Sequence, residues 1–318
     1  MGKGRIAQAL VHYLNKSKIP TCSNISGSNL IIGALGGDFG EDCLKAALRY
    51  KKNLLDVSDV DPPFYLKNKH QIKKSGITVI PGCGFSPGLV NLVIGRELEK
   101  NPGIKKIEIS AGSLSQKKNY FPFLWCFEDL ILGHKLLSSQ LVRGKKKNFA
   151  PLAELRKENF FGIKSESYLS ASGIENLFTG SGLTDFCYRV VRPDGFNNFL
   201  RFLINQGFLD KDNFSVTKKI LEEKKQDNIS FASINLSGLG KEISWLIKSF
   251  SKGNETLNSM QKITSVVPVI IASFLREDRI NKGLIFMEEL GKDEILFSDL
   301  IKRAREEGIV LRRLSKND

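Results

Sequence analysis

The sequence predicts an α/β fold class: a parallel sheet wrapped by helices, joined to a second α+β domain with a mostly antiparallel sheet. Three observations support this. Helix-like and strand-like segments alternate through the first hundred residues, as crossover-connected parallel strands require. After about residue 105, apolar and polar residues alternate, as in half-buried strands. The chain has 318 residues, enough for two domains. We expect residues 1–104, completed by 259–318, to form the first domain and residues 105–258 the second.

Short apolar runs alternate with amphipathic segments in the first domain. The apolar runs predict buried strands, and spacings of three and four between apolar residues predict helices. The expected helices are residues 6–14, 41–50, 65–75 and 87–98, and the expected strands are residues 28–35, 53–57 and 77–80, with a further strand candidate at 19–22.

The later elements have a different pattern. Residues 106–111, 165–169 and 228–236 alternate as strands do, and residues 196–206 form an amphipathic helix between them. Towards the end of the chain, we expect helices at 259–275, with a kink at Pro268, and at 296–307, then a strand at 310–313.

Composition excludes several classes of protein. Hydrophobic residues make up 41% and charged residues 26%, which are ordinary globular values. We expect no membrane span, because no run of about 20 apolar residues occurs. The apolar start lacks a small-residue cleavage site, so we expect no signal peptide. The five cysteines are scattered and the three histidines are not spaced as ligands, which predicts a cytoplasmic protein without a metal site.

The net charge of +14 invites a nucleic-acid interpretation, which we weigh and reject. The excess lysine is spread along the chain, and only Lys145, Lys146 and Lys147 form a tight run. This run follows Arg143 and Gly144, so we expect it at a solvated hairpin tip.

A glycine fingerprint begins the chain. Gly2, Gly4 and Ala7 match the pattern GxGxxA immediately before a helix. In such a pattern the glycines permit a tight turn and close approach to a pyrophosphate, which the helix N-terminus then receives. The fingerprint predicts a Rossmann-like domain that binds NAD(P), and a glycine-bearing terminal tail is the alternative.

The residues after the fingerprint favour NADP over NAD. No Asp or Glu occurs before Asp38, whereas an acidic residue about 20 positions on normally binds the ribose hydroxyls of NAD. The polar, uncharged Ser23 and Asn24 follow the strand candidate at 19–22, and a ribose phosphate is better tolerated beside them than beside a carboxylate.

Two further strands end in loops rich in small residues. The strand at 28–35 ends in Ala34 and Leu35, followed by two glycines, so its backbone can lie flat against a ribose or nicotinamide ring. The loop 81–88 holds two prolines and three glycines between a strand and a helix. Ligands bind at such loops, at the carboxyl ends of parallel strands.

These segments resemble the saccharopine dehydrogenase family, in its lysine 6-dehydrogenase-like branch. The resemblance is carried by residues 53–59 (NLLDVSD) and 76–91 (GITVIPGCGFSPGLVN), and the loop around Cys83 is its most specific part. It continues through residues 123–128, 141–145, 191–196, 203–208 and 264–274, then Gly283 and Glu288, and so covers nearly all of the chain.

The chain departs from this family at its start. Family members have a complete strand before the fingerprint and a longer stretch before the strand that corresponds to residues 28–35. Loss of a central strand would expose the edges of its neighbours. We expect a start upstream of Met1, with a reduced relative as the alternative.

The resemblance implies hydride exchange between NAD(P) and an amino-acid carbon that bears nitrogen, through an imine. It implies Gly84, Phe85, Pro87 and Ser58 as further cofactor-binding residues. Arg192 is expected to bind the substrate carboxylate, because guanidinium binds carboxylates bidentately.

Other side chains are candidates near the substrate. Asp59 or Glu128 is expected to move a proton, and either could instead be a structural carboxylate. Trp125 is expected to line the pocket and Cys83 to lie beside the cofactor, without acting as a nucleophile. The expected function is thus an oxidoreductase of the CH–NH type in lysine metabolism.

Two alternatives stay open. One is a non-catalytic relative that binds a metabolite or a partner. The other is a reductase of a carboxylated polyamine. In each case we expect a homodimer formed through the second domain, without nucleic-acid or membrane partners.

Overall fold

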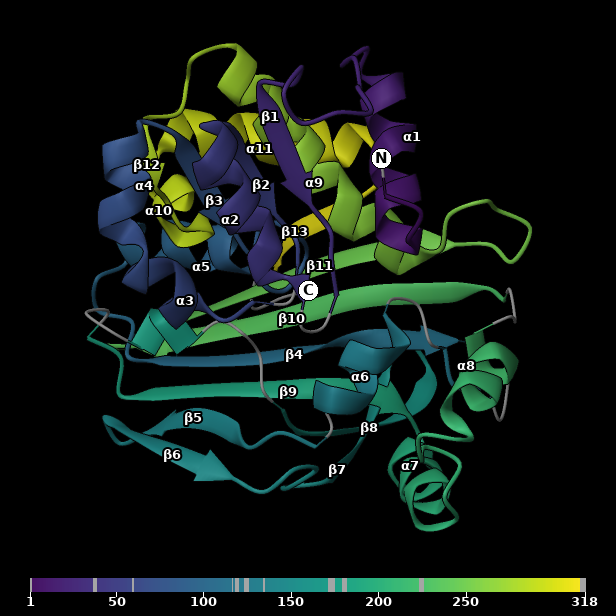
Figure 1. Ribbon diagram of the computed structural model, residues 1–318. Helices are drawn as coiled ribbons and strands as arrows, with labels where there is room; N and C mark the ends of the chain where they lie inside the picture. Colours follow the sequence, from purple (N-terminus) through teal and green to yellow (C-terminus); the bar gives the residue numbers. More distant parts are fainter. Residues whose placement is uncertain are drawn as a thin grey trace.

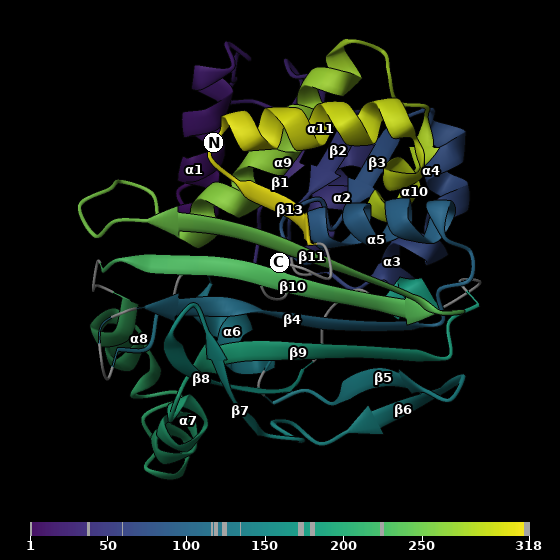
Figure 2. The ribbon, with the colours of Figure 1, turned by 180° about the vertical axis from the view of Figure 1, so that it is seen from behind.

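The computed structural model places the chain in two sheets (Figures 1 and 2). It describes residues 2–36, 39–58, 60–115, 117, 120–122, 126–133, 135–170, 175–178, 182–222 and 226–314, with the backbone alone at 129, 175, 178 and 222. A parallel sheet lies above a larger mixed sheet in the view of Figure 1. The predicted fold class is therefore confirmed.

The first sheet is parallel and has four strands in the order β1-β2-β3-β12. Its strand β1 is an edge strand. The first three strands are neighbours in sequence order, and β12, from near the C-terminus, pairs with β3. Residues far apart in sequence therefore complete one sheet. The strands are β1 (Leu30–Gly33), β2 (Asn53–Asp56), β3 (Thr78–Pro81) and β12 (Gly283–Leu284).

Both faces of this sheet are covered, because successive apolar residues of its strands point to opposite sides. Leu54 and Val79 pack with one group of helices, whereas Leu55 and Ile80 pack with the other. The first group is α2 (Glu41–Tyr50), α3 (Pro62–Lys67) and α4 (Lys69–Ser75). The second includes α1 (Arg5–Lys16), α9 (Ser259–Arg276) and α11 (Glu294–Glu306), and Figures 1 and 2 show the two groups from opposite sides.

The helix after β3 packs unusually closely on a later helix. A Cβ at Gly95 of α5 (Leu89–Lys100) would lie 2.1 Å from the carbonyl oxygen of Glu288. One at Gly291 of α10 (Met287–Lys292) would lie 2.0 Å from that of Leu92. Glycine at both positions is thus what allows the two backbones to meet.

The second sheet has nine strands and is mostly antiparallel, as predicted. Its central pair, β4 and β9, is parallel. The strands are β4 (Lys106–Ser115), β5 (Ser138–Val142), β6 (Lys145–Phe149), β7 (Arg156–Phe160), β8 (Ile163–Leu169), β9 (Asp185–Pro193), β10 (Asn228–Gly238), β11 (Lys241–Ser251) and β13 (Val310–Leu314). Strand β13, the last strand described, pairs with β11 and so belongs to this sheet. The predicted domain boundaries stay a prediction.

Short helices lie toward one end of the second sheet, with α6 in front of its strands in the view of Figure 1. Their aromatic and aliphatic residues form a separate small core around Phe127 and Phe196. The helices are α6 (Phe127–Gly133), α7 (Phe196–Asn205) and α8 (Phe214–Glu222), and a 3-10 turn, η2 (Glu175–Phe178), lies elsewhere on this domain.

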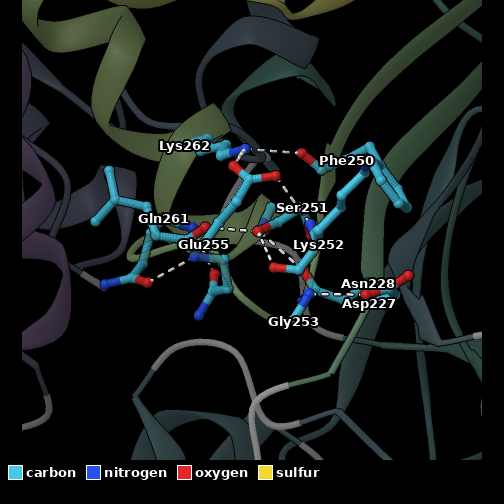
Figure 3. A network of polar contacts seen from close by, with 12 residues as sticks. Asp227, Asn228, Phe250, Ser251, Lys252, Gly253, Glu255, Gln261 and Lys262 are labelled. Carbon is cyan, nitrogen blue, oxygen red and sulfur yellow. Dashed lines mark hydrogen bonds and ion pairs between the residues drawn. The ribbon is translucent and has the colours of Figure 1, made fainter.

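A polar network fixes the start of α9 where the chain leaves β11 (Figure 3). The Ser251 hydroxyl donates to the carbonyl of Leu257 at 2.6 Å, and Lys262 pairs with Glu255. The Asn258 side chain accepts from the backbone N–H of Gln261 at 2.8 Å and caps the helix. The first turns of α9 are therefore held in place, and these turns face the candidate site.

Three local expectations are corrected. Residues 19–22 are not a strand, and Pro20 there lacks the N–H that a strand partner would need. Residues 65–75 are not one helix, because Asn68 ends α3 with its side chain donating to the carbonyl of Phe64 at 2.8 Å. The lysine run lies in the exposed strand β6, just beyond the turn at Gly144 rather than in it.

Candidate functional site

The carboxyl ends of β1, β2 and β3 meet at one edge of the first sheet. Six of the predicted cofactor-binding residues lie in the three loops that follow these strands. Leu35 is exposed, Ala34 and Pro87 are half-buried, and Ser58, Gly84 and Phe85 are buried. The structure therefore brings together residues from three separate loops at the position where such sheets bind ligands.

A buried carboxylate joins these loops. Asp56, the last residue of β2, is fully buried, and its Oδ1 accepts the backbone N–H of Ser58 at 2.9 Å. Its Oδ2 accepts the hydroxyl of Tyr65 at 2.8 Å. The hydroxyl of Ser58 in turn accepts the backbone N–H of Leu35 at 3.0 Å. Burial raises the pKa of Asp56, while these hydrogen bonds oppose the rise.

Two thiols border the same carboxylate. Cys83 is fully buried, and both its N–H and its Sγ donate to the backbone carbonyl of Asp56, at 3.1 Å and 3.5 Å. Burial raises the pKa of the Cys83 thiol well above its usual value. Burial and the charge of Asp56 raise the pKa of Cys43 to about 11. Both thiols are therefore protonated at neutral pH, which fits the expectation that Cys83 is not a nucleophile.

Helix α9 connects this edge to the start of α1. A Cβ built on Gly84 would lie 3.1 Å from Cγ2 of Thr264. Gln261, one turn earlier on α9, donates from Nε2 to the carbonyl of Arg5 at 2.9 Å. Residues three apart share a helix face. The loop after β3 and the first residue of α1 therefore contact the same face of α9.

The fingerprint residues lie at the N-terminus of α1. Gly4 is its N-cap and, as a glycine, has no side chain to cap the helix. A Cβ on Gly2 would lie 3.0 Å from Cβ of Ala7, so the preceding turn folds back on the helix. Backbone N–H groups in this arrangement suit an anion such as a phosphate.

Ser23 and Asn24 lie in an exposed loop between α1 and β1. The Asn24 side chain accepts from the hydroxyl of Ser26 at 2.7 Å and from the N–H of Gly27 at 2.8 Å, so it shapes a turn. The proposed contact with a ribose phosphate stays a prediction.

The second sheet reaches the same loops through β9. The hydroxyls of Ser86 and Tyr188 lie 3.2 Å apart. Phe85 packs in one core cluster with Phe186 and Tyr188. Tyr188 and Arg192 are four residues apart on one strand and therefore share a face. The face of β9 that meets the loop after β3 is thus the face that carries Arg192.

Arg192 is almost completely buried, with 2% of its surface exposed. Its guanidinium lies 5.7 Å from the ring centre of Phe196, and the pKa of Arg192 is lowered by burial while Tyr168 and Tyr188 oppose that change. Tyr168 is paired with Val190 of β9 across from β8. Arg192 therefore lies in an aromatic environment that would strengthen its attraction to an anion.

The side chain of Glu128 accepts hydrogen bonds from Lys218 and Cys126 rather than from residues of these loops. It lies on α6, exposed, and forms an ion pair with Lys218 of α8 at 2.6 Å. Partial burial raises its pKa, but the hydrogen bond from Lys218 and two others lower it on balance. Asp59 and Trp125 lie outside the described residues, so their roles stay predictions.

The described part of the chain holds no group of three or more His, Cys, Asp or Glu that could bind a metal ion. None of its helices is long and apolar enough to span a bilayer.

The sequence reasoning missed Asp56, Tyr65, Tyr188 and Thr264. One signal was present: a carboxylate that ends an otherwise apolar strand has to be buried and paired. The others gave no signal, because their importance depends on contacts between distant elements.

No protein-family model matches the chain. Its fold is similar to that of a solved structure. The apo saccharopine dehydrogenase (L-Glu forming) from Saccharomyces cerevisiae matches with a TM-score of 0.71 and 14% identity, over 97% of this chain and 87% of that one. The C. glutamicum DAP dehydrogenase in complex with DAP matches at a TM-score of 0.47 and 11% identity, over 95% and 97%. The first match shows a shared fold.

Proposed function

We propose that the chain is an NAD(P)-dependent oxidoreductase that acts on a C–N bond of an amino acid, with hydride transfer through an imine. The observation that carries the proposal is the contact of Ser86, in the loop after β3, with Tyr188, on the face of β9 that carries Arg192. The fold that it shares with a saccharopine dehydrogenase supports it.

The residues at this edge fit a dinucleotide. The N-terminus of α1, which begins after a glycine N-cap, would receive the pyrophosphate. The exposed Leu35 and half-buried Ala34 and Pro87 offer an apolar surface to a ring, over a backbone that Ser58 fixes. When bound there, a nicotinamide supplies or accepts the hydride.

The chain's own residues then have three tasks. Arg192 binds the substrate carboxylate, which places the carbon that bears nitrogen toward the loops after the strands. Phe85 and Tyr188, both buried in one apolar cluster, are proposed to exclude water from the substrate. Asp59, which directly follows Ser58 in the chain, is proposed to take or give the proton, with Glu128 as the alternative.

A titration of the protein with NADPH and with NADH tests this proposal, with nicotinamide fluorescence as the signal. We expect saturable binding of at least one, and tighter binding of NADPH, because Ser23 and Asn24 put no carboxylate near a ribose phosphate. Reduction of NADP or NAD with a panel of lysine-related amino acids, followed at the absorbance of the reduced nicotinamide, then tests the chemistry. Absence of binding by either cofactor would overturn the proposal.

A non-catalytic relative that binds a metabolite is the second candidate. The first sheet favours it in one respect, because β1 is an edge strand and nothing described extends the sheet toward the fingerprint helix. Binding of an amino acid without binding of either cofactor would support this candidate. Turnover of a carboxylated polyamine, rather than of an amino acid, would instead support the polyamine reductase.

We also propose that the protein is a homodimer through the second domain. Light scattering after size-exclusion chromatography would give its mass in solution, and a mass near that of one 35.5 kDa chain would contradict the proposal.

A further inference from the structure

Asp56 is a fully buried carboxylate with three separate groups of hydrogen bonds around it. Its Oδ1 accepts a hydrogen bond from the N–H of Ser58, and its Oδ2 accepts one from the hydroxyl of Tyr65. Its backbone carbonyl holds the N–H of Cys83. A buried charge is costly unless its hydrogen bonds are satisfied, so this arrangement is built rather than incidental.

These bonds reach all three loops. Ser58 belongs to the loop after β2, and Cys83 belongs to the loop after β3. The loop after β1 is reached through a relay: the N–H of Leu35 donates to the hydroxyl of Ser58, and that hydroxyl bonds to the Asp56 side chain. The side chain of Asp56 therefore connects the loops after β1 and β2, and its backbone carbonyl accepts from the loop after β3.

The neighbouring strand makes room for the carboxylate. Gly33 of β1 is paired with Asp56 of β2, and a Cβ at Gly33 would lie 2.5 Å from Oδ1 of Asp56. Any other residue at position 33 would displace the carboxylate or the strand. Glycine at position 33 and aspartate at position 56 are thus matched across the sheet.

We propose that Asp56 is a positioning residue whose side chain fixes the loops after β1 and β2, next to the loop after β3, in the arrangement that receives the nicotinamide cofactor. The inference rests on the proposed function for its ligand, but not for its geometry. Preformed loops bind a ligand more tightly, because they lose less conformational entropy when the ligand binds. Asp56 itself is buried beneath these loops and acts through Ser58.

The test compares four variants with the wild-type protein. Asp56→Ala removes every side-chain bond. Asp56→Asn keeps one oxygen for the N–H of Ser58, and Tyr65 can turn its hydroxyl to accept from the new amide. Tyr65→Phe removes one donor. Asp61→Ala is the matched control, because Asp61 is exposed and makes no side-chain cap bond on the nearby helix α3.

Cofactor affinity is the first measurement. We expect Asp56→Ala to weaken NADPH binding by about tenfold or more, since at least two buried hydrogen bonds are lost. Asp56→Asn should recover a part of this loss, and Tyr65→Phe should cost about threefold. The fluorescence of bound NADPH at saturation should also differ in Asp56→Ala, which a general loss of stability would not produce. Asp61→Ala should bind as the wild type does.

Amide hydrogen exchange is the second measurement, and it needs no cofactor. In Asp56→Ala, we expect the amides of Leu35 and Ser58 to exchange faster together, and in Asp56→Asn to a smaller extent. The amide of Cys83, which bonds to the backbone carbonyl of residue 56, and the amides within β2 and β3 should stay protected. Faster exchange at Ser58 alone, or wild-type NADPH affinity in Asp56→Ala, would overturn the inference. If Asp56→Ala does not fold, the same comparison is made with Asp56→Asn and Tyr65→Phe.

The two proposals fail in different ways. If the wild-type protein binds neither NADPH nor NADH, the proposed function and the ligand named here are overturned. Exchange at Leu35 and Ser58 would then still decide whether the Asp56 side chain fixes the loops after β1 and β2.

Discussion

The hydroxyl of Ser86 lies 3.2 Å from the hydroxyl of Tyr188, and this contact joins the loop after β3 to the second sheet. Ser86 belongs to the glycine- and proline-rich loop 81–88, and Tyr188 belongs to β9, on the same face as Arg192. The cofactor side and the substrate side of the proposed site are therefore coupled by one hydroxyl pair.

Tyr188→Phe removes this hydrogen bond and keeps the ring in the core. We expect the free energy of unfolding to fall by about 1 kcal/mol, the usual net value of one such bond. We also expect NADPH binding to weaken by roughly threefold, because the loop after β3 loses a contact that orders it. Denaturant unfolding and fluorescence titration measure the two effects.

Ser86→Ala is the matching change on the other partner. A double variant that loses no more than either single variant would show that the two hydroxyls act on each other. Fully additive losses would contradict the coupling.

Most of the first sheet could be predicted from the sequence, because short runs of neighbouring residues define its strands and loops. The runs at 28–35, 53–57 and 77–80 became β1, β2 and β3, and Gly84 and Phe85 lie at the edge expected of them. Parallel strands require their carboxyl ends to meet, so the loops could be placed together before the structure was known.

The predictions that were wrong or missing concern features that depend on contacts between residues far apart in the sequence. Residues 19–22 have a strand-like composition, but a strand needs a partner, and Pro20 removes a donor. Asp56 was read as part of an apolar strand, whereas its role depends on Gly33 and on loops from elsewhere. Tyr188 contacts Ser86, which lies 102 residues earlier in the chain, and no pattern in a single sequence predicts such a contact.

The pH dependence of stability should identify the charge state of Asp56. Burial raises its pKa in the folded protein above the unfolded value, so the folded state binds this proton more readily. The contribution of Asp56 to stability is therefore fully present below the unfolded pKa, near 3.9, and is lost as the pH rises through the folded pKa. Asp56→Asn removes this dependence.

We expect the stability difference, Asp56→Asn minus wild type, to increase with pH across that window, by at most about 1.4 kcal/mol per pH unit. The groups that face Asp56 are Tyr65, Cys43 and Cys83, whose pKa values are all raised, so they stay protonated throughout. Chemical unfolding at a series of pH values measures the difference. A flat difference would show that Asp56 does not titrate in this window.

Arg192→Lys tests the proposed substrate contact. Lysine keeps the charge but loses the planar fork that binds a carboxylate bidentately and stacks near Phe196. We expect kcat/KM for the amino-acid substrate to fall by about 100-fold, since a bidentate contact contributes roughly 3 kcal/mol. NADPH affinity should change by less than about threefold. An equal loss of cofactor and substrate binding would instead indicate a purely structural role.

Gln261→Ala tests the link between α9 and the fingerprint helix. The Gln261 side chain donates to the carbonyl of Arg5 and also accepts from the N–H of Asn258 at 2.9 Å, within the network of Figure 3. We expect a loss of about 1–2 kcal/mol in the free energy of unfolding and faster amide exchange in the first turn of α1. Gln261→Glu keeps the bond to Asn258 but not the donor to Arg5. It should therefore reproduce the change in exchange at α1 with a smaller loss of stability.

Gly84→Ala tests how closely α9 approaches the loop after β3. The added Cβ would lie 3.1 Å from Cγ2 of Thr264, which is tighter than ordinary contact, and 3.6 Å from Cγ1 of Val57. The backbone of Gly84 is not among the positive-φ positions, so the cost comes from crowding rather than from backbone strain. We expect a loss of about 1–2 kcal/mol in the free energy of unfolding.

Thr264→Ser removes the crowding methyl group and should restore a large part of this loss in the double variant. Thr264→Ser alone should cost less than Gly84→Ala, because it removes only one methyl group. If the double variant is as unstable as the sum of the two single variants, the contact between α9 and this loop is not what limits position 84.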